Sequence, residues 1–285
     1  GGIFRTTDAG ATWEPVFDDQ PVASVGALAI DPVNTNVIWA GTGETFIRSN
    51  VLTGNGIYKS VDGGDSWQHM GLDKTGRIGR IVVDPLHPEV VFAAAMGHAY
   101  GPQQERGVFR TKDAGKTWER VLFVDEHTGA ADVVMDPNNP NIMFAGTWPL
   151  LIRTWGRTSG GPGGGLWMSK DGGDTWKNLT GTRGLPSGPI GKIGLGMTKA
   201  DSKRVYALIE TSSNGLIAPV DPGHGTLYRS DDGGASWNAV SSDHDLMQRP
   251  LYYTRLAVSP DDPDELHTMA TRHRRSLDGG RTWTS

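Results

Sequence analysis

The stretch SVDGGDSW at residues 60–67 decides the fold, because its pattern recurs along the whole chain. The pattern has eight positions, with Ser or Thr at the first, Asp at the third, Ala or Gly at the fourth, Gly at the fifth, Ser or Thr at the seventh and Trp at the eighth. It occurs six times. Its aspartates are Asp8, Asp62, Asp113, Asp171, Asp232 and Asp278, at intervals of 54, 51, 58, 61 and 46 residues. Six of the 10 tryptophans close a copy. Such a period indicates a fold assembled from repeated units.

Each copy has the composition of a β-hairpin turn. A short alternating run typical of a strand precedes it, such as residues 57–60 and 108–111. The aspartate can accept hydrogen bonds from backbone N–H groups further along the turn, and the last glycine can adopt a positive φ. The tryptophan begins the returning strand with a large apolar surface to bury. We therefore expect the six aspartates to be structural and the six tryptophans to be largely buried.

A second pattern lies between the copies. It is an apolar strand, a turn that usually contains proline, and a second apolar strand. It covers residues 26–41, 80–94, 133–146, 193–209 and 256–270, of which 193–209 lacks the proline. Together with the hairpin it gives four strands per repeat of about 50 residues, the spacing of β-propeller blades. The apolar pair would form the two inner strands of a blade, and the repeated turn would join the two outer strands.

The repeated phrase resembles the Asp-box, or bacterial neuraminidase repeat. This motif occurs in sialidases, oligoxyloglucan-cleaving hydrolases, sortilin-type receptors and photosystem II assembly factors. The stretches at residues 76–85, 105–111 and 250–253 make the chain similar to the N-terminal propeller of large secreted bacterial proteins described as sortilin-like or glycosyl-hydrolase-like. The resemblance implies a propeller over essentially the whole chain, but the same turn serves enzymes, receptors and assembly factors.

The repeat count predicts an incomplete blade. Six hairpins are present but only five inner strand pairs, because the chain starts at Gly1-Gly2-Ile3, directly before the first hairpin. We therefore predict an all-β fold over a single domain, residues 1–285: a β-propeller of four-stranded antiparallel blades with six Asp-box repeats, whose first blade lacks its two inner strands. An open ring would leave strand edges unpaired, so we also expect the sequence to be part of a longer chain.

Composition excludes several classes of protein. The net charge of −5 argues against a nucleic-acid-binding face. The absence of cysteine excludes disulfides, thiolate metal sites and cysteine nucleophiles, and the eight histidines show no metal-binding spacing. The longest apolar run, residues 90–96, is far short of the ~20 residues that cross a bilayer. We expect no metal, no cofactor and no membrane span.

A binding site is expected on the propeller face opposite the Asp-box turns, where the loops are longest. These loops cover residues 43–55, 97–106, 148–164 and 211–225. Candidate binding residues on this face are Glu44, His98, Trp148, Arg153, Trp155, Arg157, Glu210 and Arg255. The segment 148–157 is notable because two tryptophans and two arginines could stack on sugar rings or hold a protein partner. The alternative is a solvated rim, with both tryptophans covering the wall of a neighbouring blade.

Three functions follow from the resemblance. The favoured one is a non-catalytic protein-interaction scaffold outside the cytoplasm, such as an accessory or assembly subunit of a membrane complex like a photosystem. The alternative is the carbohydrate-binding propeller of a glycoside hydrolase. The Arg-Ile-Pro motif of sialidases is absent, and xyloglucan-cleaving enzymes place two aspartates across a cleft between two propellers. A peptide receptor of the sortilin kind, with ten blades, would need more than six repeats. A protein partner is therefore expected, with a carbohydrate as the second possibility.

Overall fold

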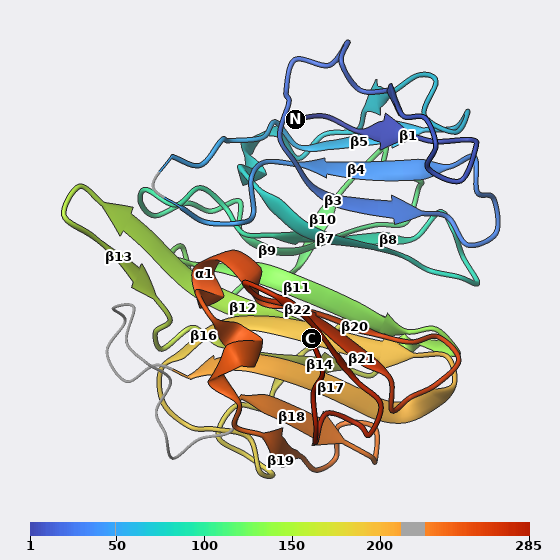
Figure 1. Cartoon of the computed structure of the whole chain (residues 1–285). Helices are drawn as coiled ribbons and strands as arrows, with labels where there is room; N and C mark the ends of the chain where they lie inside the picture. The colour runs from blue at the N-terminus through green and yellow to red at the C-terminus, as the bar shows by residue number, and fades with distance from the viewer. Residues whose placement is uncertain (49, 212–225) are drawn as a thin grey trace.

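The computed structural model describes residues 1–48, 50–211 and 226–285. Its regular elements are almost all β-strands, and they form a propeller of five blades of mostly four antiparallel strands (Figure 1). The first blade consists of β3 (Val25–Ile30), β4 (Ile38–Thr42), β5 (Ile57–Ser60) and β6 (Gln68–His69). The second consists of β7 (Ile78–Val83), β8 (Val91–Ala95), β9 (Gly107–Thr111) and β10 (Glu119–Leu122).

The remaining blades vary in strand number. The third contains β11 (Thr128–Asp136), β12 (Asn139–Arg153), β14 (Gly165–Ser169) and β15 (Lys177–Asn178), with β13 (Gly156–Ser159) paired to the end of β12. The fourth contains β16 (Ile190–Thr198), β17 (Asp201–Thr211), β18 (Leu227–Ser230) and β19 (Asn238–Ser241). The fifth has β20 (Arg255–Val258), β21 (Leu266–Met269) and β22 (His273–Ser276), extended by a bridge from Arg275 to Thr284.

Two further features lie outside these sheets. The first Asp-box turn joins β1 (Phe4–Arg5) to β2 (Glu14–Pro15) in a separate two-stranded hairpin, which packs against the outer part of the first blade. The helical segments of the described chain are η1 (Asp73–Thr75), η2 (His244–Met247) and α1 (Pro250–Tyr253).

The apolar pairs predicted from the sequence are the inner strands. Consecutive first strands pack on one another: β3 on β7, β7 on β11, β11 on β16 and β16 on β20. Side chains between neighbouring sheets form the core, as in the cluster of Trp39, Ile78 and Val91 between the first two blades. Glycines let these strands approach closely. A Cβ on Gly26 would lie 2.5 Å from the carbonyl oxygen of Ile78 in the next blade.

The Asp-box turns are closed by local hydrogen bonds. In the second copy, Asp62 Oδ1 accepts from Ser60 Oγ at 2.7 Å and from the Ser66 N–H at 2.9 Å, and Oδ2 accepts from Ser66 Oγ at 2.5 Å. Hydrogen bonds from the Ser66 hydroxyl and N–H and from Ser60 lower the pKa of Asp62 to about 2. Gly64 takes a φ of 99°, and its N–H donates to Ser60 Oγ at 2.8 Å. The prediction that this turn joins the outer strands of a blade is confirmed.

The prediction that all six Asp-box tryptophans are largely buried is wrong. Only Trp237 is buried, with 2% of its surface exposed, whereas Trp13 is 61% exposed. The other four have intermediate exposure. The difference depends on the preceding blade. Trp237 packs in one apolar cluster with Leu179 and Leu185, whereas the indole N–H of Trp13 donates to Gly10 within its own turn at 3.1 Å.

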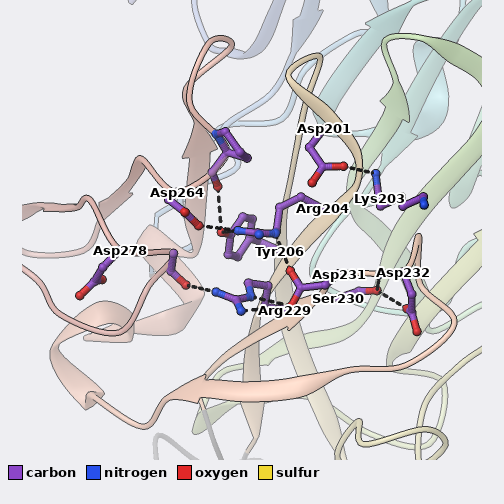
Figure 2. Close-up of polar contacts among 12 residues, drawn as sticks. Asp201, Lys203, Arg204, Tyr206, Arg229, Ser230, Asp231, Asp232, Asp264 and Asp278 are labelled. Carbon is purple, nitrogen blue, oxygen red and sulfur yellow. Dashed lines mark hydrogen bonds and ion pairs between the residues drawn. The ribbon is translucent and has the colours of Figure 1, made fainter.

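Charged residues join the fourth and fifth blades on the side of the Asp-box turns (Figure 2). Arg204 reaches Asp231 at 2.6 Å and Asp264 at 2.5 Å, and it donates to the Tyr206 hydroxyl at 3.0 Å. Arg229 also pairs with Asp231, at 3.0 Å. Asp264 lies in the turn that precedes β21, so Arg204 ties its own blade to the last one.

Candidate functional site

A hairpin that projects from the third blade carries the most exposed aromatic side chain. β12 continues past its blade to Arg153, and β13 returns from Gly156 to Ser159, with Arg153 paired to Gly156 (Figure 1). The segment predicted as a long loop, residues 148–164, therefore contains an extra strand pair over much of its length. Trp155 stands at the tip with 83% of its surface exposed.

A large cavity lies along this hairpin. Its volume is about 790 Å³, and it is lined by Tyr100 and residues 151–157. Arg153 is exposed, and Arg157 is partly buried with its Nη1 lacking a hydrogen-bond partner. The cavity thus combines two aromatic rings with two guanidinium groups. Such a surface can stack on planar groups and attract anions.

The base of the hairpin is fixed by buried hydrogen bonds. Trp148 is 1% exposed, and its indole N–H donates to Ser159 Oγ at 2.9 Å. Ser159 in turn donates to Glu210 Oε2 at 2.7 Å, and the backbone N–H of Lys192 donates to the same oxygen at 2.7 Å. Burial raises the pKa of Glu210, whereas the hydrogen bonds from Lys192 and Ser159 lower it. This network orients the hairpin and leaves Trp148 and Glu210 enclosed.

Lys192 lies at the point where blades from opposite ends of the chain meet. Its ammonium group donates to the carbonyl oxygens of Thr45 and Leu251, each at 3.3 Å, and only 3% of the residue is exposed. It also lies over the rings of Trp148 and Phe46, with Nζ 5.1 and 5.9 Å from the ring centroids. Burial, with a smaller effect from Arg255, lowers its pKa to about 7. Lys192 therefore bridges the first and last blades beside the base of the hairpin.

The other candidates lie on the same loop face but have structural partners. Glu44 pairs with Arg48 at 2.7 Å. Arg255 donates to the carbonyl oxygen of Gly79 at 2.9 Å, which ties the last blade to the second. His98 is partly buried, and burial together with Arg106 and Arg77 lowers its pKa. The loop predicted at residues 211–225 lies outside the described residues beyond Thr211.

The structure thus separates the eight candidates into two groups. Arg153, Trp155 and Arg157 share one accessible hairpin. The other five are enclosed or paired: Glu44, His98, Trp148, Glu210 and Arg255. Sequence reasoning missed Tyr100 as a wall of the cavity and Ser159 as the link from Trp148 to Glu210. An aromatic residue within the long loop 97–106 was a signal for Tyr100.

The buried carboxylates serve as hydrogen-bond acceptors for backbone groups. Asp132 is 2% exposed and accepts from the N–H of Leu195 in the next blade at 3.0 Å. It also lies 3.6 Å from Arg80. Within residues 1–48, 50–211 and 226–285, no cluster of three or more His, Asp or Glu side chains could hold a metal ion. No helix in these same ranges is long and apolar enough to cross a membrane.

Comparison with protein families and curated proteins identifies relatives. The Sortilin-Vps10 family model (sortilin, neurotensin receptor 3) matches residues 55–183. A xyloglucanase of Paenibacillus sp is 28% identical over 320 residues, which cover 100% of this chain and 29% of that protein. A xyloglucanase of Hypocrea jecorina is 24% identical over 89% of this chain and 30% of its own length. The chain therefore spans less than a third of these two relatives.

Solved structures show the same fold. The GH74 enzyme of Niastella koreensis superimposes with a TM-score of 0.60 at 16% identity, over 99% of this chain and 50% of that chain. YCF48 bound to D1 peptide superimposes with a TM-score of 0.56 at 19% identity, over 99% of this chain and 74% of that chain. Both similarities concern the fold alone. The repeated turns, the five blades and these comparisons together show that the chain is an Asp-box β-propeller related to the Sortilin-Vps10 family and to the xyloglucanases.

Proposed function

We propose that this propeller is a non-catalytic binding module outside the cytoplasm, and that it docks an acidic segment of a protein partner on the β12–β13 hairpin. One observation carries the proposal: Trp155, 83% exposed, stands between two arginines beside a cavity of about 790 Å³. Tryptophan and arginine are the residue types that dominate interaction hot spots. The location outside the cytoplasm rests on the resemblance to secreted propellers.

The charge of the hairpin favours an acidic ligand. Arg157 Nη1 is buried without a hydrogen-bond partner, and Arg153 is solvent-exposed. A carboxylate on a partner would satisfy the first group and be attracted by the second. The network of Trp148, Ser159 and Glu210 holds the hairpin in place, so little conformational entropy need be lost on binding. A solved structure of YCF48, a protein of the same fold, holds the D1 peptide.

The test is selection from a displayed library of random peptides, first with the unmodified protein and then with variants. We expect enrichment of acidic sequences, with affinities that fall as salt rises. Trp155→Ala should weaken a selected peptide by about 2 kcal/mol, roughly 30-fold, without lowering the melting temperature. Trp13→Ala is the matched control, because Trp13 is also exposed but lies in the β1–β2 hairpin. Equal losses in both variants, or enrichment of neutral sequences, would refute the proposal.

A glycan ligand is the second candidate, favoured by the curated relatives. The six that match are xyloglucanases, and their alignments cover 84–100% of this chain. Xyloglucan is neutral, so its binding should depend on the stacking of Trp155 and hardly on salt. Affinity electrophoresis in gels containing xyloglucan distinguishes the two candidates. If xyloglucan retards the protein in the gel even at high salt, and Trp155→Ala abolishes the retardation, the ligand of the hairpin is a polysaccharide and not an acidic protein segment.

A further inference from the structure

Two arginines next to strands of the second blade are buried, and no ion pair is found for either of them among the described residues. Arg77 is 0% exposed and Arg106 is 1% exposed. Arg77 Nη1 donates to the carbonyl oxygen of Gly97 at 3.2 Å. Arg106 donates to the carbonyl oxygens of His127, Gly101 and His98 at 2.9, 2.8 and 2.5 Å. Among the residues that the structure describes, no acidic side chain lies within ion-pair distance of either guanidinium.

Three donors of this pair have no hydrogen-bond partner: Nε and Nη2 of Arg77 and Nε of Arg106. The Nε and Nη2 atoms of one guanidinium form the fork that donates two parallel hydrogen bonds to a carboxylate. Both arginines lie next to Gly97. The carbonyl oxygen of Gly97 accepts a hydrogen bond from Arg77, and a Cβ atom placed on Gly97 would lie 2.7 Å from Nε of Arg106. The free donors are therefore grouped around one short stretch of backbone.

Arg110 is a buried arginine whose donors are occupied. Arg110 is 5% exposed, but it contacts Glu119 and Asp174, each at 2.7 Å, and the carbonyl oxygen of Gly172 at 2.7 Å. Burial lowers the pKa of Arg106 to about 10, the charge of Asp125 opposes this lowering, and the charge of Arg77 adds to it. Glu44 acts on Arg77 and Asp125 acts on Arg106, but neither carboxylate makes an ion pair with them. Two like charges in a buried place, with donors unused, therefore favour the binding of an anion.

We propose that Arg77 and Arg106 form a binding site for the carboxylate group of a small ligand. Arg77 would hold the carboxylate through its Nε–Nη2 fork, and Arg106 would add a third hydrogen bond through Nε. Tyr100 links the pair to the cavity along the β12–β13 hairpin, because it lines the cavity and interacts electrostatically with Arg77. The burial of both arginines selects a small ligand over a folded partner. The donors of this site belong to Arg77 and Arg106 and not to the hairpin, so the two proposals can fail separately.

The test measures thermal unfolding of the full chain in acetate, succinate or chloride, with ionic strength and pH held constant. Binding to the native state raises the melting temperature in proportion to the logarithm of ligand concentration above Kd. We expect acetate and succinate to raise the melting temperature relative to chloride. Isothermal titration with succinate then gives the affinity directly. Equal melting temperatures in all three salts would mean that water satisfies the guanidinium groups, and would overturn the proposal.

Variants locate the response. Arg77→Lys keeps the charge but removes the fork, so it should weaken succinate binding by at least about tenfold. Arg110→Lys is the matched control: it also alters a buried arginine, but one whose donors are occupied, and it should keep the affinity for succinate. If Arg77→Lys does not fold, Arg106→Lys tests the same site. A carboxylate response that survives in both of these variants refutes the assignment.

Discussion

The pKa of Lys192 predicts that the stability of this propeller rises with pH above neutrality. A fall in pKa from 10.5 to about 7 means that the folded protein releases the proton more readily than the unfolded chain does. Between these two values the unfolded state binds more protons, so the free energy of unfolding increases with pH. At 1.36 kcal/mol per unit, the full shift corresponds to about 5 kcal/mol. About 3 kcal/mol of this should appear between pH 7 and 9.5.

Other groups change the slope less directly. Burial raises the pKa of Glu210, so this carboxyl group lowers stability as pH rises above 4.5, whereas the lowered pKa of Lys59 adds stability as pH rises towards 10.5. Burial raises the pKa of Tyr206, which therefore reduces stability only above pH 10. The lowered pKa of His98 acts below its ordinary value of 6.5. Lys192→Met removes the titrating group, and the carbonyl oxygen of Leu251 keeps its hydrogen bond from the Ile47 N–H at 3.1 Å. The carbonyl oxygen of Thr45 loses the ammonium donor, at a cost of about 1–3 kcal/mol that is independent of pH.

Urea unfolding followed by tryptophan fluorescence at several pH values measures this slope. The unmodified protein should gain about 3 kcal/mol between pH 7 and 9.5, and Lys192→Met should give a nearly flat profile. Lys177→Met is the control, because Lys177 lies in an exposed outer strand, and it should keep the slope. A flat profile in the unmodified protein, or an unchanged slope in Lys192→Met, would refute the assignment.

Three further outcomes are expected. Asp62→Ala should lower the melting temperature without changing ligand binding, and the stability that Asp62 confers should be present above pH 3.8 and lost as pH falls through about 2. Trp237→Ala should destabilise by about 3–5 kcal/mol because the indole is 2% exposed, whereas Trp13→Ala should have a much smaller effect in the same denaturation assay. Reducing-sugar assays should detect no hydrolysis of β-glucans or sialosides by this chain, and turnover that a Glu44 or Glu210 substitution abolishes would contradict a non-catalytic role.

The blade architecture could be predicted because its determinants are local. Asp62 contacts Ser60 and Ser66, two and four residues away, so the turn is visible as a sequence pattern. The exposure of a tryptophan could not be predicted in the same way. The exposure depends on which side chains of the preceding blade contact the indole ring, and the repeated pattern contains no information about those side chains. Trp237 and Trp13 occupy the same position in the repeat and differ in burial for this reason.

The candidate site was predicted in part. The two tryptophans and two arginines of the segment 148–157 indicated a binding site there. The structure places three of these residues, Arg153, Trp155 and Arg157, on one hairpin. Trp148 has the same residue type but lies inside. Its indole N–H donates to Ser159, 11 positions further along the chain, and Ser159 donates to Glu210, 51 positions beyond that. The unpaired state of Arg77 was not predictable either, since it depends on where distant carboxylates fall in space.

The Asp-box turns also bear on how the chain folds. Their hydrogen bonds join residues two to four positions apart, so each hairpin can form before the blades meet. The contact of Arg255 with the carbonyl oxygen of Gly79 spans 176 residues, and that of Lys192 with Thr45 spans 147. Closing such long segments carries the largest loop entropy, so these contacts should form last. The outer hairpins would then be protected from hydrogen exchange early in refolding, and the centre of the propeller would be the late, rate-limiting region.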